Sequence, residues 1–231
     1  MTEADPAPGK EPAWDPAPDR PYASRGGLKL AHALDTFGLD PAGLACADLG
    51  CSTGGFTDCL LRRGAASVVA VDTAYGELAW ALRNDPRVTV MERTNALHAQ
   101  PPGRVDLVVI DIGWTPQRLA LPTAARWLAP GGRIITLIKP HYELTDEQRR
   151  LGGDAGVLEE SQAQEVVDRV VRGVASMGFE MLSLTRSPIL GGAGKRKRRS
   201  RGNAEWLALV VPSGSSAHAS PATPGKPDAA G

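Results

Sequence analysis

The sequence has few cysteines, no long apolar run and no excess of either charge. No stretch approaches the ~20 apolar residues that span a bilayer, and the acidic start, Met-Thr-Glu-Ala-Asp-Pro, is unlike a secretory signal. The three cysteines, Cys46, Cys51 and Cys59, lack zinc-type spacing. Lys plus Arg equal Asp plus Glu at 26 each, which argues against a generic polycation. We therefore expect a cytoplasmic protein with reduced thiols and no contact with a membrane.

The two ends differ in composition from the middle of the chain. Residues 1–20 are rich in Pro, Ala and Asp, and residues 213–231 are rich in Ser, Ala, Pro and Gly. Neither end has apolar periodicity, so neither can offset its ordering entropy by burial. We predict two disordered tails around one domain at 21–212, a length that can bury a full core.

Strand-like and helix-like segments alternate through this domain. Seven short apolar or β-branched segments are expected as strands: Leu44–Leu49, Ser67–Val71, Val88–Met91, Val105–Ile110, Arg133–Ile138, Glu180–Thr185 and Glu205–Val211. Five segments between or before them are expected as helices: Leu28–Phe37, Thr57–Arg63, Tyr75–Leu82, Pro116–Leu128 and Glu159–Met177. The alternation predicts an α/β fold with a doubly wound, mostly parallel sheet of about seven strands.

Ionisable residues follow four of the expected strands, where ligands bind in a doubly wound sheet. These residues are Asp48, Asp72, Asp111 and Lys139. Each alone could be an ordinary residue at the exit of a strand. Because two of them follow largely apolar runs, we interpret the set as one site.

A glycine-rich loop joins the first strand to a helix. It reads Asp48-Leu-Gly-Cys-Ser-Thr-Gly-Gly-Phe56, and it lacks the second glycine of the G-x-G-x-x-G dinucleotide motif. This spacing suits a methionine-like tail lying over the turn, with Asp72 placed to accept hydrogen bonds from a ribose diol. The alternative is a purely structural turn.

Several motifs, taken in order, resemble the TlyA (haemolysin A) branch of the FtsJ-like RNA methyltransferases. They are Ser24-Arg-Gly-Gly-Leu-Lys-Leu30, Asp48–Asp58, Tyr75-Gly-Glu-Leu-Ala-Trp80, Leu82–Val88, Glu92-Arg-Thr-Asn-Ala96, Ile138-Lys-Pro-His-Tyr-Glu143 and Gly202-Asn-Ala-Glu-Trp206. The resemblance covers about residues 22–211.

The resemblance implies a Rossmann-like methyltransferase that uses S-adenosylmethionine to methylate the 2′-hydroxyl of RNA, with ribosomal RNA or a ribosomal subunit as partner. By motif position, the implied catalytic set is Lys29, Asp111, Lys139 and Glu205. The implied cofactor-binding residues are Asp48, Gly50, Ser52, Thr53, Gly54, Gly55, Phe56, Asp72, Thr94, Asn95 and Asp111.

The chain departs from the family pattern in four places, which bear on the target RNA more than on the reaction. The usual N-terminal S4-type RNA-binding domain has no counterpart, and Ile112-Gly-Trp-Thr115 replaces a Ser-Phe pattern. His141 and Tyr142 replace Gln-Phe, and a basic run at Lys195–Arg201 looks like an insertion.

A ribose hydroxyl is a weak nucleophile and must lose its proton as it attacks the methyl group. We assign Lys139 as the general base that takes this proton. A second lysine, Lys29, and partial burial both favour the neutral amine that a base requires. Asp111 and Glu205 would orient the two amines and keep the total charge of the site near zero.

Cations outside the catalytic set are candidates for binding RNA. They are Arg25, Lys195, Arg196, Lys197, Arg198, Arg199 and Arg201. Such a basic run can be merely solvated, or it can be an arm that neutralises phosphates. Trp114 is a candidate base-stacking residue because it follows Asp111 at the expected mouth of the site.

Three other functions compete with RNA methylation. A methyltransferase of a small molecule or a protein would share the glycine loop, and a non-catalytic RNA-binding relative would share the fold. The haemolysin name suggests membrane lysis, but no amphipathic or apolar membrane segment supports it. The four histidines are scattered, so we expect no metal site. The sequence identifies neither the target nucleotide nor the oligomeric state.

Overall fold

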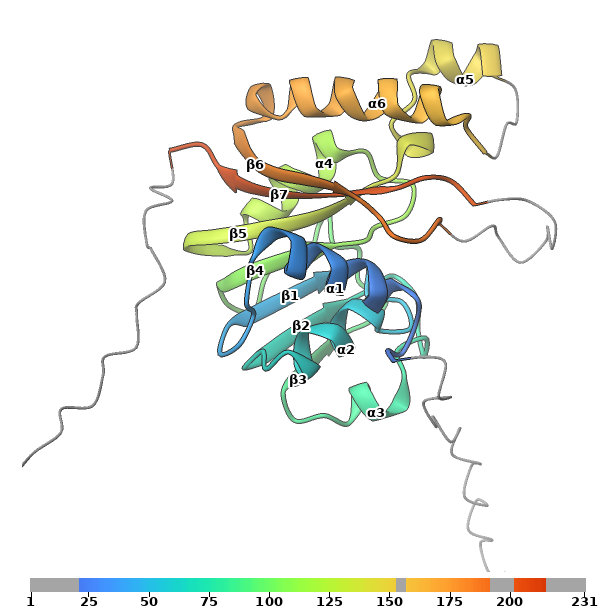
Figure 1. The fold of residues 1–231 in the computed structure, drawn as a ribbon. Helices are drawn as coiled ribbons and strands as arrows, with labels where there is room; N and C mark the ends of the chain where they lie inside the picture. Colours follow the sequence, from blue (N-terminus) through green and yellow to red (C-terminus); the bar gives the residue numbers. More distant parts are fainter. Residues whose placement is uncertain (1–20, 153–156, 192–201, 215–231) are drawn as a thin grey trace, which may run out of the picture.

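The computed structural model describes residues 21–152, 157–191 and 202–214, which form a single seven-stranded sheet with helices on both faces (Figure 1). The strands are β1 (Ala45–Leu49), β2 (Ser67–Val71), β3 (Val88–Met91), β4 (Val105–Ile110), β5 (Leu128–Ile138), β6 (Phe179–Arg186) and β7 (Trp206–Pro212). Their spatial order is β3-β2-β1-β4-β5-β7-β6. The first five strands are parallel, and β7 is antiparallel to β5 and β6.

The helices divide into two layers. The α-helices are α1 (Gly26–Phe37), α2 (Gly55–Arg62), α3 (Trp80–Arg83), α4 (Gln117–Ala125), α5 (Asp146–Gly152) and α6 (Glu160–Gly173). Two 3-10 turns, η1 (Pro140–Tyr142) and η2 (Ala175–Met177), complete the described elements. One apolar cluster packs α1 and α2 against the sheet, and a second packs α4 and α6 against the other face.

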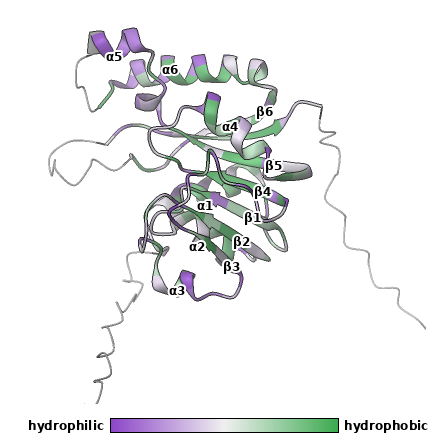
Figure 2. Ribbon diagram, turned by 180° about the vertical axis from the view of Figure 1, so that it is seen from behind, coloured by the Kyte–Doolittle hydropathy of each residue, from purple (hydrophilic) through white to green (hydrophobic). Residues whose placement is uncertain are grey.

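Burial explains why the strands are almost wholly apolar. Leu107, Val108, Val109 and Ile135 are all fully buried because both faces of the central strands are covered. Figure 2 shows the strands mostly in hydrophobic colours and α5 in hydrophilic ones. No helix in the described ranges is long and apolar enough to cross a membrane.

The α/β class, the doubly wound order and the two late antiparallel strands confirm the fold predicted from the sequence. The prediction of two disordered tails concerns residues 1–20 and 213–231, of which 1–20 and 215–231 lie outside the described residues. Ser213 and Gly214 form a turn, and the Ser213 N–H donates to the Gly178 carbonyl at 2.9 Å.

The prediction of a helix over Tyr75–Leu82 was wrong for its first half. Only Trp80–Arg83 is helical, because tertiary hydrogen bonds fix the preceding turn. Gly76 N–H donates to the Glu92 carboxylate at 2.8 Å, and Ala79 N–H donates to the Thr53 carbonyl at 3.1 Å. These contacts cannot be read from helical periodicity.

Other element boundaries also differ from the prediction, and one helix was missed. The helix expected to end at Leu128 ends at Ala125, and Leu128 instead begins β5. The last long helix breaks after Gly173 into a 3-10 turn. The prediction missed α5 because its short, polar sequence has no apolar face to reveal a helical period.

Candidate active site

Four sequence-distant residues line one polar cavity at the carboxyl edge of the parallel strands. The cavity measures about 230 Å³, and its described lining includes Lys29, Asp111, Lys139 and Glu205. Asp111 and Lys139 directly follow β4 and β5. Glu205 precedes β7, whose antiparallel start pairs Trp206 with Ile138 at the same edge. The sheet topology therefore brings the predicted catalytic set together.

Lys139 and Asp111 form an ion pair through the Lys139 Nζ and the Asp111 Oδ1. Their side chains retain 14% and 24% of their accessible surface, which makes this the more accessible of the two ion pairs in the cavity. A substrate entering the cavity would therefore reach Lys139 more readily than Lys29.

Lys29 and Glu205 form the deeper ion pair, and their side chains retain 10% and 4% of their accessible surface. Lys29 lies in the first turn of α1, which packs against β7. Gly191 is required beside this pair, since a Cβ there would lie 2.3 Å from Glu205 Oε1. The pair is built by close packing as well as by charge.

Aromatic side chains form one side of the cavity and its rim. The His141 and Tyr142 rings lie 4.0 Å apart between centroids, and Tyr142 and Trp114 lie 4.8 Å apart. Burial and the neighbouring Lys139 lower the pKa of His141 to about 4, so the imidazole is neutral at neutral pH. Trp114 is 84% exposed and has a left-handed φ of 61°, an uncommon backbone conformation for a bulky residue.

The glycine loop crosses the sheet edge beside this cavity. Gly50 has a φ of 94°, and a Cβ on it would lie 2.7 Å from the Asp111 carbonyl oxygen. Gly54 has a φ of 97° and precedes α2. Helix geometry leaves the N–H groups of Gly55 and Phe56 without intrahelical acceptors. The loop therefore offers a close backbone approach and free donors to a ligand.

Asp48 is fully buried beneath the loop. Its Oδ2 accepts hydrogen bonds from the Thr57 N–H at 2.9 Å and the Thr57 hydroxyl at 2.7 Å, which caps α2. Its Oδ1 has no hydrogen-bond partner among the described residues. Burial, together with Asp111 and Asp72, raises the pKa of Asp48 to about 7. A cation or a hydrogen-bond donor beside Oδ1 would give this oxygen the partner that it lacks.

Asp72 accepts hydrogen bonds from the loops that follow β1 and β2. Its two oxygens accept the Ser52 and Ala74 N–H groups, each at 2.8 Å. Its backbone carbonyl accepts the Thr94 N–H at 2.9 Å, which brings the Thr94-Asn95 turn beside it. A carboxylate has about four acceptor positions, so Asp72 retains capacity for a diol. Thr53, between the glycines, is half-buried.

The predicted RNA-binding residues are only partly within the described chain. Arg25 is exposed at the N-cap of α1, one turn before Lys29. Lys195, Arg196, Lys197, Arg198, Arg199 and Arg201 lie outside the described residues.

Sequence reasoning assigned no role to Asn203. It lines the cavity, and its Oδ1 accepts the Leu158 N–H at 2.8 Å while its backbone carbonyl accepts the Gly191 N–H at 2.8 Å. Asn203 thus links Leu158, just before α6, to the segment that carries Glu205 into β7. The Gly202–Trp206 motif contains Asn203 and could have indicated it.

A second hollow, of about 430 Å³, lies at the opposite end of β5. Arg104 is the one ionisable residue in its described lining, so it lacks the groups that chemistry requires despite its larger volume. Among the described residues, no cluster of His, Cys, Asp or Glu has the arrangement of a metal site. We therefore place the site at the polar cavity.

The chain matches the FtsJ-like methyltransferase family over residues 22–197. It is 43% identical over 180 residues to the 16S/23S rRNA (cytidine-2′-O)-methyltransferase TlyA of Mycobacterium tuberculosis, an alignment that covers 76% of this chain and 66% of that protein. It is 32% identical over 194 residues to Hemolysin A of Brachyspira hyodysenteriae, covering 82% and 77% of the two chains. The chain thus spans just under two thirds of the length of the mycobacterial relative.

A solved structure described as "Putative hemolysin from Streptococcus thermophilus" is similar in fold, with a TM-score of 0.75 at 38% identity. The match covers 84% of this chain and 68% of that one. Together with the family match over most of the sheet, these similarities show that the chain belongs to the FtsJ-like methyltransferase family, on its TlyA/hemolysin A branch.

Proposed function

We propose that this protein transfers a methyl group from S-adenosylmethionine to a ribose 2′-hydroxyl of RNA, with ribosomal RNA as the substrate. The observation that carries the proposal is the convergence of Lys29, Asp111, Lys139 and Glu205 around one cavity beside the glycine loop. The mycobacterial relative, whose name states cytidine 2′-O-methylation of ribosomal RNA, supports the same reaction.

The cofactor site fits a cationic methyl donor with an adenosine group. Asp48, Asp72 and Asp111 present carboxylates along three neighbouring strand ends, and the buried Asp48 Oδ1 lacks a partner among described residues. Asp72 would hold the ribose diol, the Thr94-Asn95 turn would lie at the adenine, and the Gly50–Phe56 loop would hold the methionine tail. Bound S-adenosylmethionine would supply the electrophilic methyl group.

Calorimetry tests this cofactor assignment directly. We expect saturable binding of S-adenosylmethionine or its demethylated product. The loop lacks the second glycine that a dinucleotide pyrophosphate requires, so NAD should not compete. Saturable NAD binding that displaces the methyl donor would contradict the assignment.

The four catalytic candidates have different roles in the proposed proton transfer. Lys139 would accept the hydroxyl proton after its ammonium group has released a proton, and Asp111, its partner in the resting ion pair, would hold the Nζ in place. Glu205 holds Lys29 in the deeper pair, so the cavity contains two positive and two negative groups. This balance leaves room for a positively charged methyl donor without a net repulsive charge.

Trp114 favours RNA over a small molecule or a protein as substrate. The indole stands 84% exposed at the rim and contacts Tyr142, which lines the cavity. Exposed aromatic rings beside a cavity are suited to stacking on nucleobases. Arg25 would neutralise a phosphate of the RNA, and the basic run at 195–201 is a further candidate for phosphate contacts.

Mapping 2′-O-methyl positions in cellular RNA tests the proposed function. Cells expressing the wild-type chain and cells expressing Lys139→Ala are compared. We expect at least one methylated ribose that is present only with the wild-type chain. Identical maps would show that the protein does not methylate RNA ribose in that cell.

A further inference from the structure

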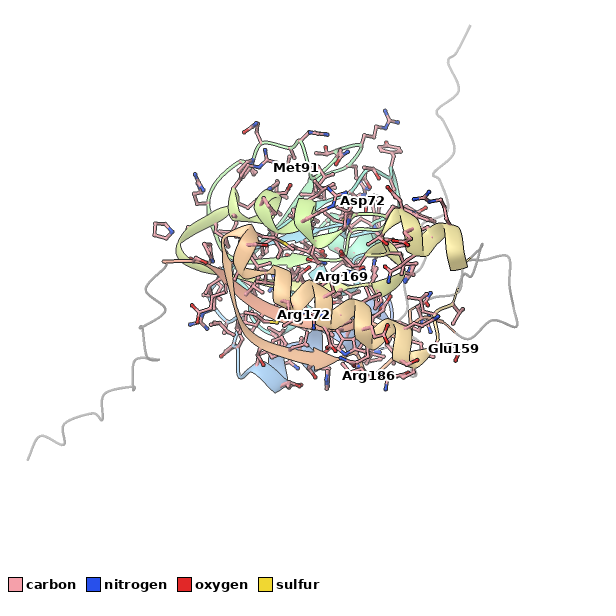
Figure 3. The ribbon with its side chains drawn as sticks, turned by 90° about the horizontal axis from the view of Figure 1, so that it is seen from above. Asp72, Met91, Glu159, Arg169, Arg172 and Arg186 are labelled. Carbon is pink, nitrogen blue, oxygen red and sulfur yellow. The ribbon has the colours of Figure 1, made fainter. Side chains whose placement is uncertain are left out.

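Three arginines from three different helices surround one half-buried carboxyl beside the active-site cavity. Arg118 lies in the first turn of α4, Arg149 on α5 and Arg169 on α6, and each electrostatically favours the ionised form of Glu143. Burial is the larger effect and raises the pKa of Glu143. Figure 3 shows Arg169 on α6 in the view onto that helix. The proposed function does not use these residues.

Glu143 is a structural partner of its neighbours. Its Oε1 accepts the Gln117 N–H at 2.8 Å and so satisfies the first turn of α4. Its backbone carbonyl accepts Arg169 Nη2 at 2.8 Å, which ties the end of η1 to α6. Glu143 therefore links the end of η1 to both α4 and α6.

No described carboxylate forms an ion pair with any of these three arginines. Within the described chain, none of the three guanidinium groups has a carboxylate oxygen within 4.0 Å. The nearby carboxylates of Asp146 and Glu147, in the first turn of α5, are also more than 4.0 Å from these guanidinium groups. Arg118 and Arg149 are exposed, so their donors are available to a ligand from solvent. Arg118 and Arg149 therefore carry exposed charges that no described carboxylate pairs.

The cluster directly adjoins the cavity. Arg149 Nη2 donates to the Tyr142 carbonyl at 3.2 Å, and the Tyr142 side chain lines the cavity beside Lys139. A ribose in the cavity carries phosphates on its neighbouring 3′ and 5′ positions. A planar guanidinium matches phosphate geometry with two parallel hydrogen bonds.

We propose that Arg118 and Arg149 bind a backbone phosphate of the RNA strand next to the ribose held at Lys139, with Glu143 as the nearby negative charge that the phosphate must overcome. This inference rests on the proposed function and adds a phosphate site to it. Phosphate contacts fix register and carry no base information. The site would therefore serve any RNA sequence equally.

The test measures the affinity of a fluorescein-labelled single-stranded RNA of mixed sequence across a salt series. The variant is Arg118→Ala with Arg149→Ala, and the control is Arg133→Ala with Arg172→Ala, which removes two exposed arginines elsewhere. We expect weaker RNA binding only in the first variant, with a log–log salt slope shallower by about 0.7 per lost phosphate contact. Affinity for S-adenosylmethionine should be unchanged in both.

A second variant reverses the sign of the effect. Glu143→Gln keeps an oxygen for the Gln117 N–H but removes the negative charge, so RNA binding should tighten and its salt slope should steepen. Equal slopes in wild type and the Arg118/Arg149 variant, an equal loss in the Arg133/Arg172 control, or weaker binding by Glu143→Gln would overturn the proposal. If the wild-type protein methylates no RNA, the proposed function itself fails, which the methylation map detects separately.

Discussion

At the residue scale, the two lysines of the cavity hold different places. Lys139 pairs with the more accessible Asp111, and Lys29 pairs with the buried Glu205. The same residue type in two environments should respond differently to truncation. This difference separates a chemical role for Lys139 from a structural role for Lys29.

Lys139→Ala should lower the rate of methyl transfer at least about 100-fold, because a general base contributes 10²–10⁴-fold. Affinity for S-adenosylmethionine should stay close to wild type, while Asp111→Ala should impair both binding and transfer.

Lys29→Ala leaves a buried carboxylate without its partner and should cost about 3–5 kcal/mol of stability. Calorimetry, single-turnover transfer and thermal unfolding measure the three effects. Wild-type turnover by Lys139→Ala would remove the general-base role.

Asp48 gives the protein a defined dependence of stability on pH. The folded carboxyl keeps its proton up to about pH 7, whereas the unfolded one loses it near 3.8. The folded state therefore binds more protons between these values, and stability falls as pH rises through this window. His141 opposes this trend, because its lowered pKa of about 4 makes stability fall as pH drops below 6.5.

Asp48→Asn isolates the contribution of this carboxyl. Asparagine can still accept the Thr57 hydrogen bonds but does not titrate, and His141 is the same in both proteins. The free energy of unfolding of the variant, relative to wild type, should rise between about pH 4 and pH 7, by at most about 4 kcal/mol. Denaturant unfolding at several pH values measures it. A difference that does not change with pH would show that Asp48 titrates normally.

At the element scale, the starts of α1 and α2 pack unusually closely. A Cβ on Gly55 would lie 2.2 Å from Ser24 Oγ and 2.8 Å from the Gly27 nitrogen. This contact joins the glycine loop to the helix that carries Lys29. The spacing between the two helices therefore depends on glycine at this position.

Gly55→Ala should push α1 from α2 and lower stability by about 1–3 kcal/mol, the usual cost of overpacking. Cofactor affinity should fall with it, because the residue opens the helix that follows the glycine loop. Gly103→Ala is the matched control, since nothing lies within 4 Å of its Cβ. Urea unfolding and calorimetry compare the two variants. Equal stability of both would mean that the helix starts adjust freely.

The strands could be predicted because burial on both faces imposes a nearly continuous apolar sequence, as in Val105–Ile110. The turn at Tyr75–Ala79 could not, because hydrogen bonds to Glu92 and Thr53 decide its shape. The short helix α5 gives no periodic signal because its sequence is polar, and the same polarity keeps it outside the core.

At the scale of the whole molecule, the site depends on long-range convergence. Lys29 and Glu205 form their ion pair across 176 positions of sequence. No local pattern predicts that contact, and its residues were named from the family resemblance. The strand-end acids could be predicted from the sheet pattern alone. The cluster of Arg118, Arg149 and Arg169 could not, because each arginine is unremarkable on its own helix.

We propose above that the cavity around Lys139 methylates a ribose 2′-hydroxyl. The most direct measurement is transfer of a radiolabelled methyl group from S-adenosylmethionine to two RNAs of one sequence. One RNA is unmodified, and the other carries 2′-hydrogen in place of 2′-hydroxyl at the mapped nucleotide. We expect transfer to the first RNA, loss of transfer to the second, and equal binding of both. Undiminished transfer to the 2′-deoxy RNA would place the methyl group on an atom other than the 2′-oxygen and rule out ribose methylation.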